Sequence, residues 1–142
     1  MQNMNPRRTI FLVEEDHTVR RPLANRLRQF GYRVLVSADT EDAFEWTSGL
    51  GYIHADLILV NLVGKQPEEA LHIGRRLREH SRYDGKTPIV VMPENVPEKL
   101  LGKDERVTDS EWICYYEDQY QLERLLANLL RETQTKSMRG PD

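Results

Sequence analysis

Cysteine and long apolar runs are both scarce in this chain. The single cysteine, Cys114, excludes an internal disulfide bond and suits a reducing compartment. No apolar run approaches the roughly 20 residues that a membrane-spanning helix needs. The polar start MQNMNPRR also lacks the apolar core of a secretory signal. We therefore expect a cytoplasmic protein that makes no membrane contact.

An excess of positive charge is also missing. Twenty basic and 23 acidic residues give a formal net charge of −3, so nothing favours direct nucleic-acid binding. The basic pairs lie among carboxylates and are predicted to be solvated faces: Arg7-Arg8, Arg20-Arg21 and Arg75-Arg76. No glycine-rich phosphate loop follows the first apolar run, which argues against a nucleotide-binding enzyme.

Apolar runs of strand length alternate with segments of helical periodicity. The runs cover residues 9–13, 33–36, 56–62, 88–92 and 112–116. Helices are expected between them: one ending before Gly31, one capped by Thr40, one beginning at Pro67, a short one over residues 98–103 and a last one with a leucine stripe. This order predicts an α/β fold, a doubly wound five-stranded parallel sheet of flavodoxin-like (βα)5 type.

The length of 142 residues suggests one domain, which we place at residues 8–132. Residues 133–142 lack periodic apolar positions and are predicted to be a flexible tail or the start of a linker to an output domain. Sheets of the expected type carry their functional groups at the carboxyl ends of the strands.

Three segments, in this order, resemble a two-component response-regulator receiver domain of the CheY-like family: residues 10–16, 55–62 and 87–92. The resemblance extends over roughly residues 8–132. It implies that the acidic pair Glu14 and Glu15 matches a magnesium-binding pair, and that Asn61 stands at the phosphoacceptor aspartate. An amide is a poor nucleophile for phosphoryl transfer, so the site is predicted to be degenerate.

The same resemblance places three further residues at positions that respond to phosphorylation. Pro93 stands at a threonine or serine that binds a phosphoryl oxygen, but proline has neither a hydroxyl nor an N–H group. Tyr115 stands at a lysine and offers one neutral donor in place of an ammonium group. Trp112 matches a switch aromatic, although simple packing explains it equally well.

The acidic run Glu14-Glu15-Asp16 has two interpretations. It could hold a weakly bound Mg²⁺, or it could cap the following helix, because carboxylates favour helix N-termini. No other cofactor is expected, and no catalytic residue suggests an enzyme.

The resemblance also implies an interaction face made by the fourth helix, fifth strand and fifth helix. The charged residues expected there are Lys99, Lys103, Glu105, Glu117, Asp118, Glu123 and Arg124, and they suit a polar, symmetric interface. The leading hypothesis is a phosphorylation-independent signalling module that binds a protein partner or a second copy of itself and controls an output, such as a transcription regulator. The alternatives are a receiver phosphorylated by a non-standard route, and a domain that binds a small ligand near Asn61, Pro93 and Tyr115.

Overall fold

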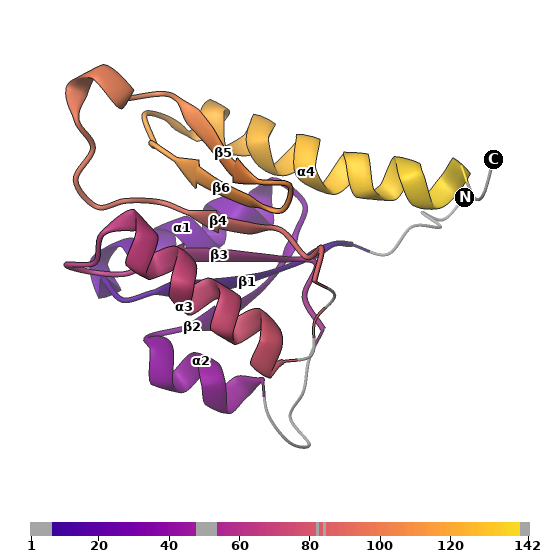
Figure 1. Cartoon of the computed structure of the whole chain (residues 1–142), viewed down its shortest axis with the longest axis horizontal. Helices are drawn as coiled ribbons and strands as arrows, with labels where there is room; N and C mark the ends of the chain where they lie inside the picture. The colour runs from indigo at the N-terminus through magenta and orange to yellow at the C-terminus, as the bar shows by residue number, and fades with distance from the viewer. Residues whose placement is uncertain (1–6, 48–53, 82, 84, 140–142) are drawn as a thin grey trace.

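A six-stranded sheet forms the centre of the molecule, with helices on both faces (Figure 1). The computed structural model describes residues 7–47, 54–81, 83 and 85–139. Its elements are β1 (Thr9–Glu14), α1 (His17–Gln29), β2 (Arg33–Ser37), α2 (Thr40–Trp46), β3 (Leu57–Asn61), α3 (Pro67–His80), β4 (Ile89–Val91), the 3₁₀ turn η2 (Glu98–Leu100), β5 (Asp104–Thr108), β6 (Glu111–Cys114) and α4 (Gln119–Arg139).

The strand order is β2-β1-β3-β4-β6-β5, and the first five of these strands are parallel. This confirms the predicted doubly wound α/β fold. The sheet also gains one strand beyond the predicted five, because β5 pairs with β6 in the antiparallel sense at the edge. Antiparallel neighbours need only a short connection, and residues 109–110 provide it.

Each face of the sheet carries its own apolar core. Alternate strand residues such as Leu12 and Leu59 pack with α1 and α4, including the fully buried Leu27 and Leu126. The intervening residues, such as Val60, pack with α2 and α3. Because both faces are covered, the central strands are apolar at nearly every position, which explains their recognisable sequence pattern.

The predicted helix over residues 98–103 is wrong. Only the 3₁₀ turn η2 forms, and the chain then enters the edge strand β5 after Gly102, whose φ of 87° favours glycine. In the described stretch 85–139 no α-helix separates β4 from β6, so a hairpin takes the place of the expected fourth helix.

Two helix ends also differ from expectation. Asp39, rather than Thr40, caps α2, because its carboxylate accepts a hydrogen bond of 2.7 Å from the Asp42 N–H group. Helix α4 continues to Arg139 and so includes residues 133–139 of the predicted tail, while residues 140–142 lie outside the described residues. No described helix is long and apolar enough to cross a membrane.

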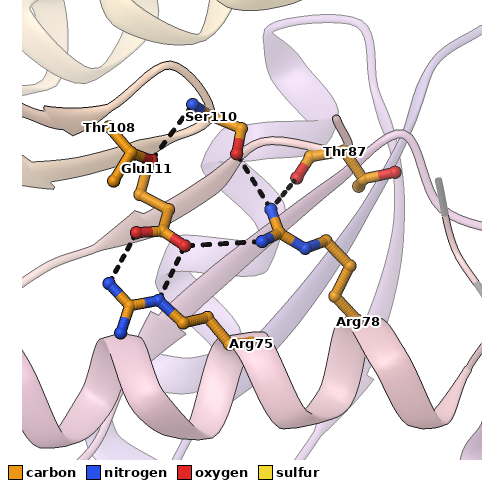
Figure 2. A network of polar contacts seen from close by, with 6 residues as sticks. All are labelled: Arg75, Arg78, Thr87, Thr108, Ser110 and Glu111. Atoms are coloured by element: carbon orange, nitrogen blue, oxygen red, sulfur yellow. Dashed lines mark hydrogen bonds and ion pairs between the residues drawn. The ribbon is translucent and has the colours of Figure 1, made fainter. Parts of the chain in front are cut away.

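A buried carboxylate fastens the hairpin to α3 (Figure 2). Glu111, 3% exposed, accepts hydrogen bonds of 2.7 and 2.6 Å from the Arg75 guanidinium and a longer one from Arg78. Arg78 also donates to the Thr87 carbonyl and the Ser110 hydroxyl. The expectation that Arg75 lies on a merely solvated face is therefore wrong, since its head group pairs with a buried acid.

Candidate functional site

Glu14 and Asn61 face each other at the carboxyl end of the sheet. They are register partners in the parallel pair β1–β3, and the Asn61 amide donates a hydrogen bond of 2.9 Å to Glu14 Oε1. The second carboxylate oxygen of Glu14 accepts a hydrogen bond from the Asp16 N–H group at 3.2 Å. The Glu14 side chain is fully buried, and both of its oxygens accept hydrogen bonds from other groups of the protein.

Burial raises the pKa of Glu14 from its ordinary value of 4.5 to about 7. Removal from water disfavours the charged form, and the hydrogen bonds from Asp16 and Asn61 offset only part of that cost. A substantial share of the molecules therefore carries a neutral Glu14 at physiological pH.

The rest of the acidic run is also held by local hydrogen bonds. Glu15 Oε1 accepts from the Val63 N–H group at 2.8 Å, and Asp16 caps α1 by accepting from the Thr18 N–H group at 2.9 Å. The Arg20 guanidinium donates to the backbone carbonyls of Glu14 and Glu15, so this arginine is also more than a solvated charge. Of the two interpretations of the run, helix capping is the one for which the structure has a direct contact.

The geometry is a poor fit to a magnesium ion. Mg²⁺ favours charged carboxylate oxygens in near-octahedral arrangement. Here the Glu14 carboxylate already accepts a hydrogen bond from Asn61, and its raised pKa makes it easy to protonate. One Glu15 oxygen accepts from the Val63 N–H group, and Asn61 presents an N–H donor to Glu14 rather than an oxygen ligand. Within the described part of the chain, no group of three or more metal-binding side chains is placed to hold an ion.

Tyr115 does not point toward Asn61, although the ligand-binding alternative placed both residues at one site. Its hydroxyl donates to Glu105 on the edge strand at 3.1 Å, and its side chain packs on the α3 face of the sheet. Side chains alternate along a strand, so the following residue, Tyr116, turns to the opposite face. There Tyr116 lines a pocket together with Asn61 and Pro93.

Trp112 lies on the α4 face of the sheet, partly buried against the core. Arg106 of the edge strand sits over its ring, 5.8 Å from the ring centroid. Its indole N–H group is buried without a hydrogen-bond partner among the described residues. This environment is one of packing and cation–π contact.

The residues of the predicted interaction face are all exposed. The set comprises Lys99, Lys103, Glu105, Glu117, Asp118, Glu123 and Arg124. Gln121 joins its two halves, because its side-chain amide donates to the Lys103 carbonyl and to Asp104, while its oxygen accepts from the Glu117 N–H group. The face is built on η2, β5 and the start of α4, without the helix that the resemblance implied.

Several residues at this end of the sheet were not identified from the sequence. They are Arg20, Arg26, Glu94 and Tyr116. The spacing of Arg26 after Val19 and Pro22, along one side of α1, was the available signal for its place. Glu94 and Tyr116 follow the ends of β4 and β6, where functional groups of such sheets gather.

Solved receiver domains share this architecture. A response regulator receiver protein from Sinorhizobium medicae is 18% identical, with a TM-score of 0.65 over 88% of this chain and 95% of that chain. The chemotaxis protein CheY4 of Vibrio cholerae is 18% identical, with a TM-score of 0.61 over 87% and 99%. The chain has the receiver-domain fold.

A third receiver fold comes from a sensor histidine kinase of Pseudomonas aeruginosa, described with a magnesium ion coordinated in its active-site cleft. It is 22% identical, with a TM-score of 0.58 over 87% of this chain and 98% of that chain. No protein-family model and no curated protein matches this chain significantly. At these identities the likeness establishes the receiver fold, while the chemistry of the site must be argued from its own residues.

Proposed function

We propose that this chain is a receiver-fold signalling module of a two-component or phosphorelay system that works without phosphorylation. It acts in the cytoplasm through contacts with a protein partner or a second copy of itself, and so controls an output such as transcription. It is not an enzyme. The observation that carries this proposal is the hydrogen bond of 2.9 Å by which the Asn61 amide donates to buried Glu14.

In that hydrogen bond the residue at the phosphoacceptor position donates to a neighbouring carboxylate and has no nucleophilic oxygen anion to offer. Transfer to a side chain needs an anionic nucleophile and partners already placed for the phosphoryl oxygens. Asn61 supplies no anion, Pro93 supplies no hydroxyl, and the Tyr115 hydroxyl is committed to Glu105. Magnesium, which is described in the cleft of the Pseudomonas receiver, would have to displace hydrogen bonds of Glu14 and Glu15 here.

The test is incubation of the protein with acetyl phosphate and Mg²⁺, followed by intact mass measurement. A receiver domain that retains its aspartate, treated in parallel, serves as the positive control. We expect no phosphoryl adduct on this chain under conditions that label the control. A stoichiometric adduct would contradict the proposal, and peptide mapping would then locate the residue used by a non-standard route.

A further inference from the structure

A hollow of about 470 Å³ opens at the carboxyl end of the sheet. It lies between α1 and the segments that follow β3, β4 and β6, and Val19, Leu23, Asn61, Met92 and Tyr116 are among its lining residues. Its volume falls within the range of pockets that hold small molecules, and its position is the usual ligand position in a doubly wound sheet.

The walls of this pocket are mainly apolar. Pro22 and Leu23 come from α1, Met92 follows β4, and Tyr116 follows β6. Two further apolar side chains of the lining, Val19 and Val63, are 38% and 47% exposed. Water therefore contacts apolar surface here that a ligand could cover, with a gain roughly proportional to the area removed from water.

The charged groups of the lining differ in how far they are already engaged. Asp16 caps α1, and Glu94 accepts a hydrogen bond from the Gly64 N–H group at 3.2 Å. The Arg26 guanidinium has no ion pair and no hydrogen bond to any residue that the structure describes. These hydrogen bonds leave both carboxylates charged, but Arg26 is the charged side chain of this lining that is free to pair with a ligand, and its positive charge complements an anionic group.

We propose that this pocket binds a small, largely apolar molecule that carries one carboxylate. Its apolar body lies against Pro22, Leu23, Met92 and Tyr116, and its carboxylate pairs with Arg26, whose planar guanidinium suits bidentate contact with such a group. The ligand provides the input signal in a domain that receives no phosphoryl group; only this signalling role rests on the proposed function.

Amide-resolved NMR titration of the full chain tests the site with four probes: phenylacetate, octanoate and their neutral amides. We expect saturable shift changes at α1, at Val63 and at Tyr116. Each carboxylate should bind about tenfold more tightly than its amide, because a hydrogen bond to a charged group is worth more than a neutral one. Absence of saturation by all four probes at millimolar concentration, or saturable changes confined to another surface, would overturn the proposal.

Two variants and a matched control sharpen the result. Arg26→Gln should weaken carboxylate binding about tenfold and leave amide binding unchanged. Arg28→Gln removes a neighbouring arginine of the same helix, which donates to Asn25 and is not part of the lining, and should change neither. Val19→Trp should obstruct the pocket and weaken all four probes. If Arg26→Gln and the unmodified protein bound the carboxylates equally well, Arg26 would not be the group that recognises the carboxylate. Phosphodonor labelling is measured separately, so either proposal can fail without the other.

Discussion

Asn61 differs from an aspartate by one amino group in place of an oxygen, and that difference reverses its relation to Glu14. The amide donates to the buried carboxylate and lowers its pKa, although burial has the larger, opposite effect. An aspartate in the same place would set two carboxylates against each other, one of them fully buried. Like charges at this distance raise pKa values unless a cation neutralises them.

Asn61→Asp should therefore fail to restore efficient phosphorylation. The phosphoryl group would still lack the partners absent at Pro93 and Tyr115, and each lost preplaced donor costs about 2–4 kcal/mol of transition-state stabilisation. Two such losses slow transfer by roughly three orders of magnitude or more. Intact mass and Trp fluorescence with acetyl phosphate and Mg²⁺ measure this. Asn128→Asp, which adds a carboxylate at an exposed position of α4, is the control. Rapid stoichiometric labelling of Asn61→Asp would show that Asn61 alone blocks the site.

Glu14 should make the protein less stable as the pH rises. Its folded-state pKa of about 7 lies above the ordinary value of 4.5, so the folded state binds more protons between these values. The stabilisation is fully present below about pH 4.5 and is lost as the pH rises through about 7. A pKa shift of this size corresponds to about 3–4 kcal/mol, of which about 2–3 kcal/mol is lost between pH 5 and 8.

Urea unfolding of the unmodified protein and Glu14→Gln at a series of pH values isolates this effect, because other titrating groups are common to both. We expect the variant to gain stability relative to the unmodified protein as the pH rises from 5 to 8, by about 2–3 kcal/mol. A pH-independent difference between the unmodified protein and Glu14→Gln would mean that Glu14 is already charged at pH 5.

At the scale of elements, the attachment of the β5–β6 hairpin to α3 depends on Glu111. Glu111→Gln leaves the mostly buried Arg78 without its anionic partner, whereas Arg75 can turn to water. We expect a loss of about 2–3 kcal/mol in the free energy of unfolding, toward the low end for a broken buried pair.

Chemical denaturation measures this loss, and Asp109→Asn is the matched control. Asp109 pairs with Arg106 in the same hairpin, but both side chains are exposed, so its removal should change stability by no more than about 0.5 kcal/mol. Similar losses in the two variants would show that the network of Figure 2 is no stronger than a surface pair.

The elements that the sequence predicted well are those whose pattern comes from burial. Strand β3, for example, is buried at four of its five positions, so nearly every residue is apolar. Strand β5 reads DERVT and is exposed throughout, so neither alternation nor apolar content identifies it. It is a strand because β6 offers a free edge, and its charged side chains discourage further pairing at its own edge.

The candidate site was predictable only in part for a similar reason. Parallel pairing of two apolar strands brings their ends together, so the proximity of Glu14 and Asn61 followed from the pattern. The direction of the Tyr115 side chain could not be predicted in this way. It depends on which side chains of β6 face each side of the sheet, and on Glu105, which belongs to the strand that the sequence did not reveal. The pairing of Arg75 with Glu111 joins residues 36 positions apart and left no local signal.

Across the whole molecule, the two buried acids lie at opposite ends of the parallel sheet and respond oppositely to pH. Glu14 ends β1 and has a raised pKa, whereas Glu111 begins β6 and has its pKa lowered, mainly by its hydrogen bonds with Arg75. The stabilisation from Glu111 is present above its ordinary pKa and is lost as the pH falls through its folded-state value. The acid at the pocket end therefore contributes stability below neutral pH, whereas the acid at the other end contributes it above its own ordinary pKa.

The last expectation concerns assembly. Lys99, Lys103, Glu105, Glu117, Asp118, Glu123 and Arg124 are all exposed and carry both signs of charge, so a two-fold arrangement can pair positive side chains of one copy with negative side chains of the other. We expect a weak dimer that forms without a phosphodonor and weakens as ionic strength rises, because exposed charges are screened. Sedimentation by analytical ultracentrifugation over a range of protein concentrations measures it.

Glu117→Lys reverses the sign of the summed charge of these seven residues and should shift the equilibrium toward monomer, whereas Glu79→Lys, at an exposed position on α3, should not. A strict monomer at high micromolar concentration and low salt would remove the dimer and leave a different protein as the partner of this face.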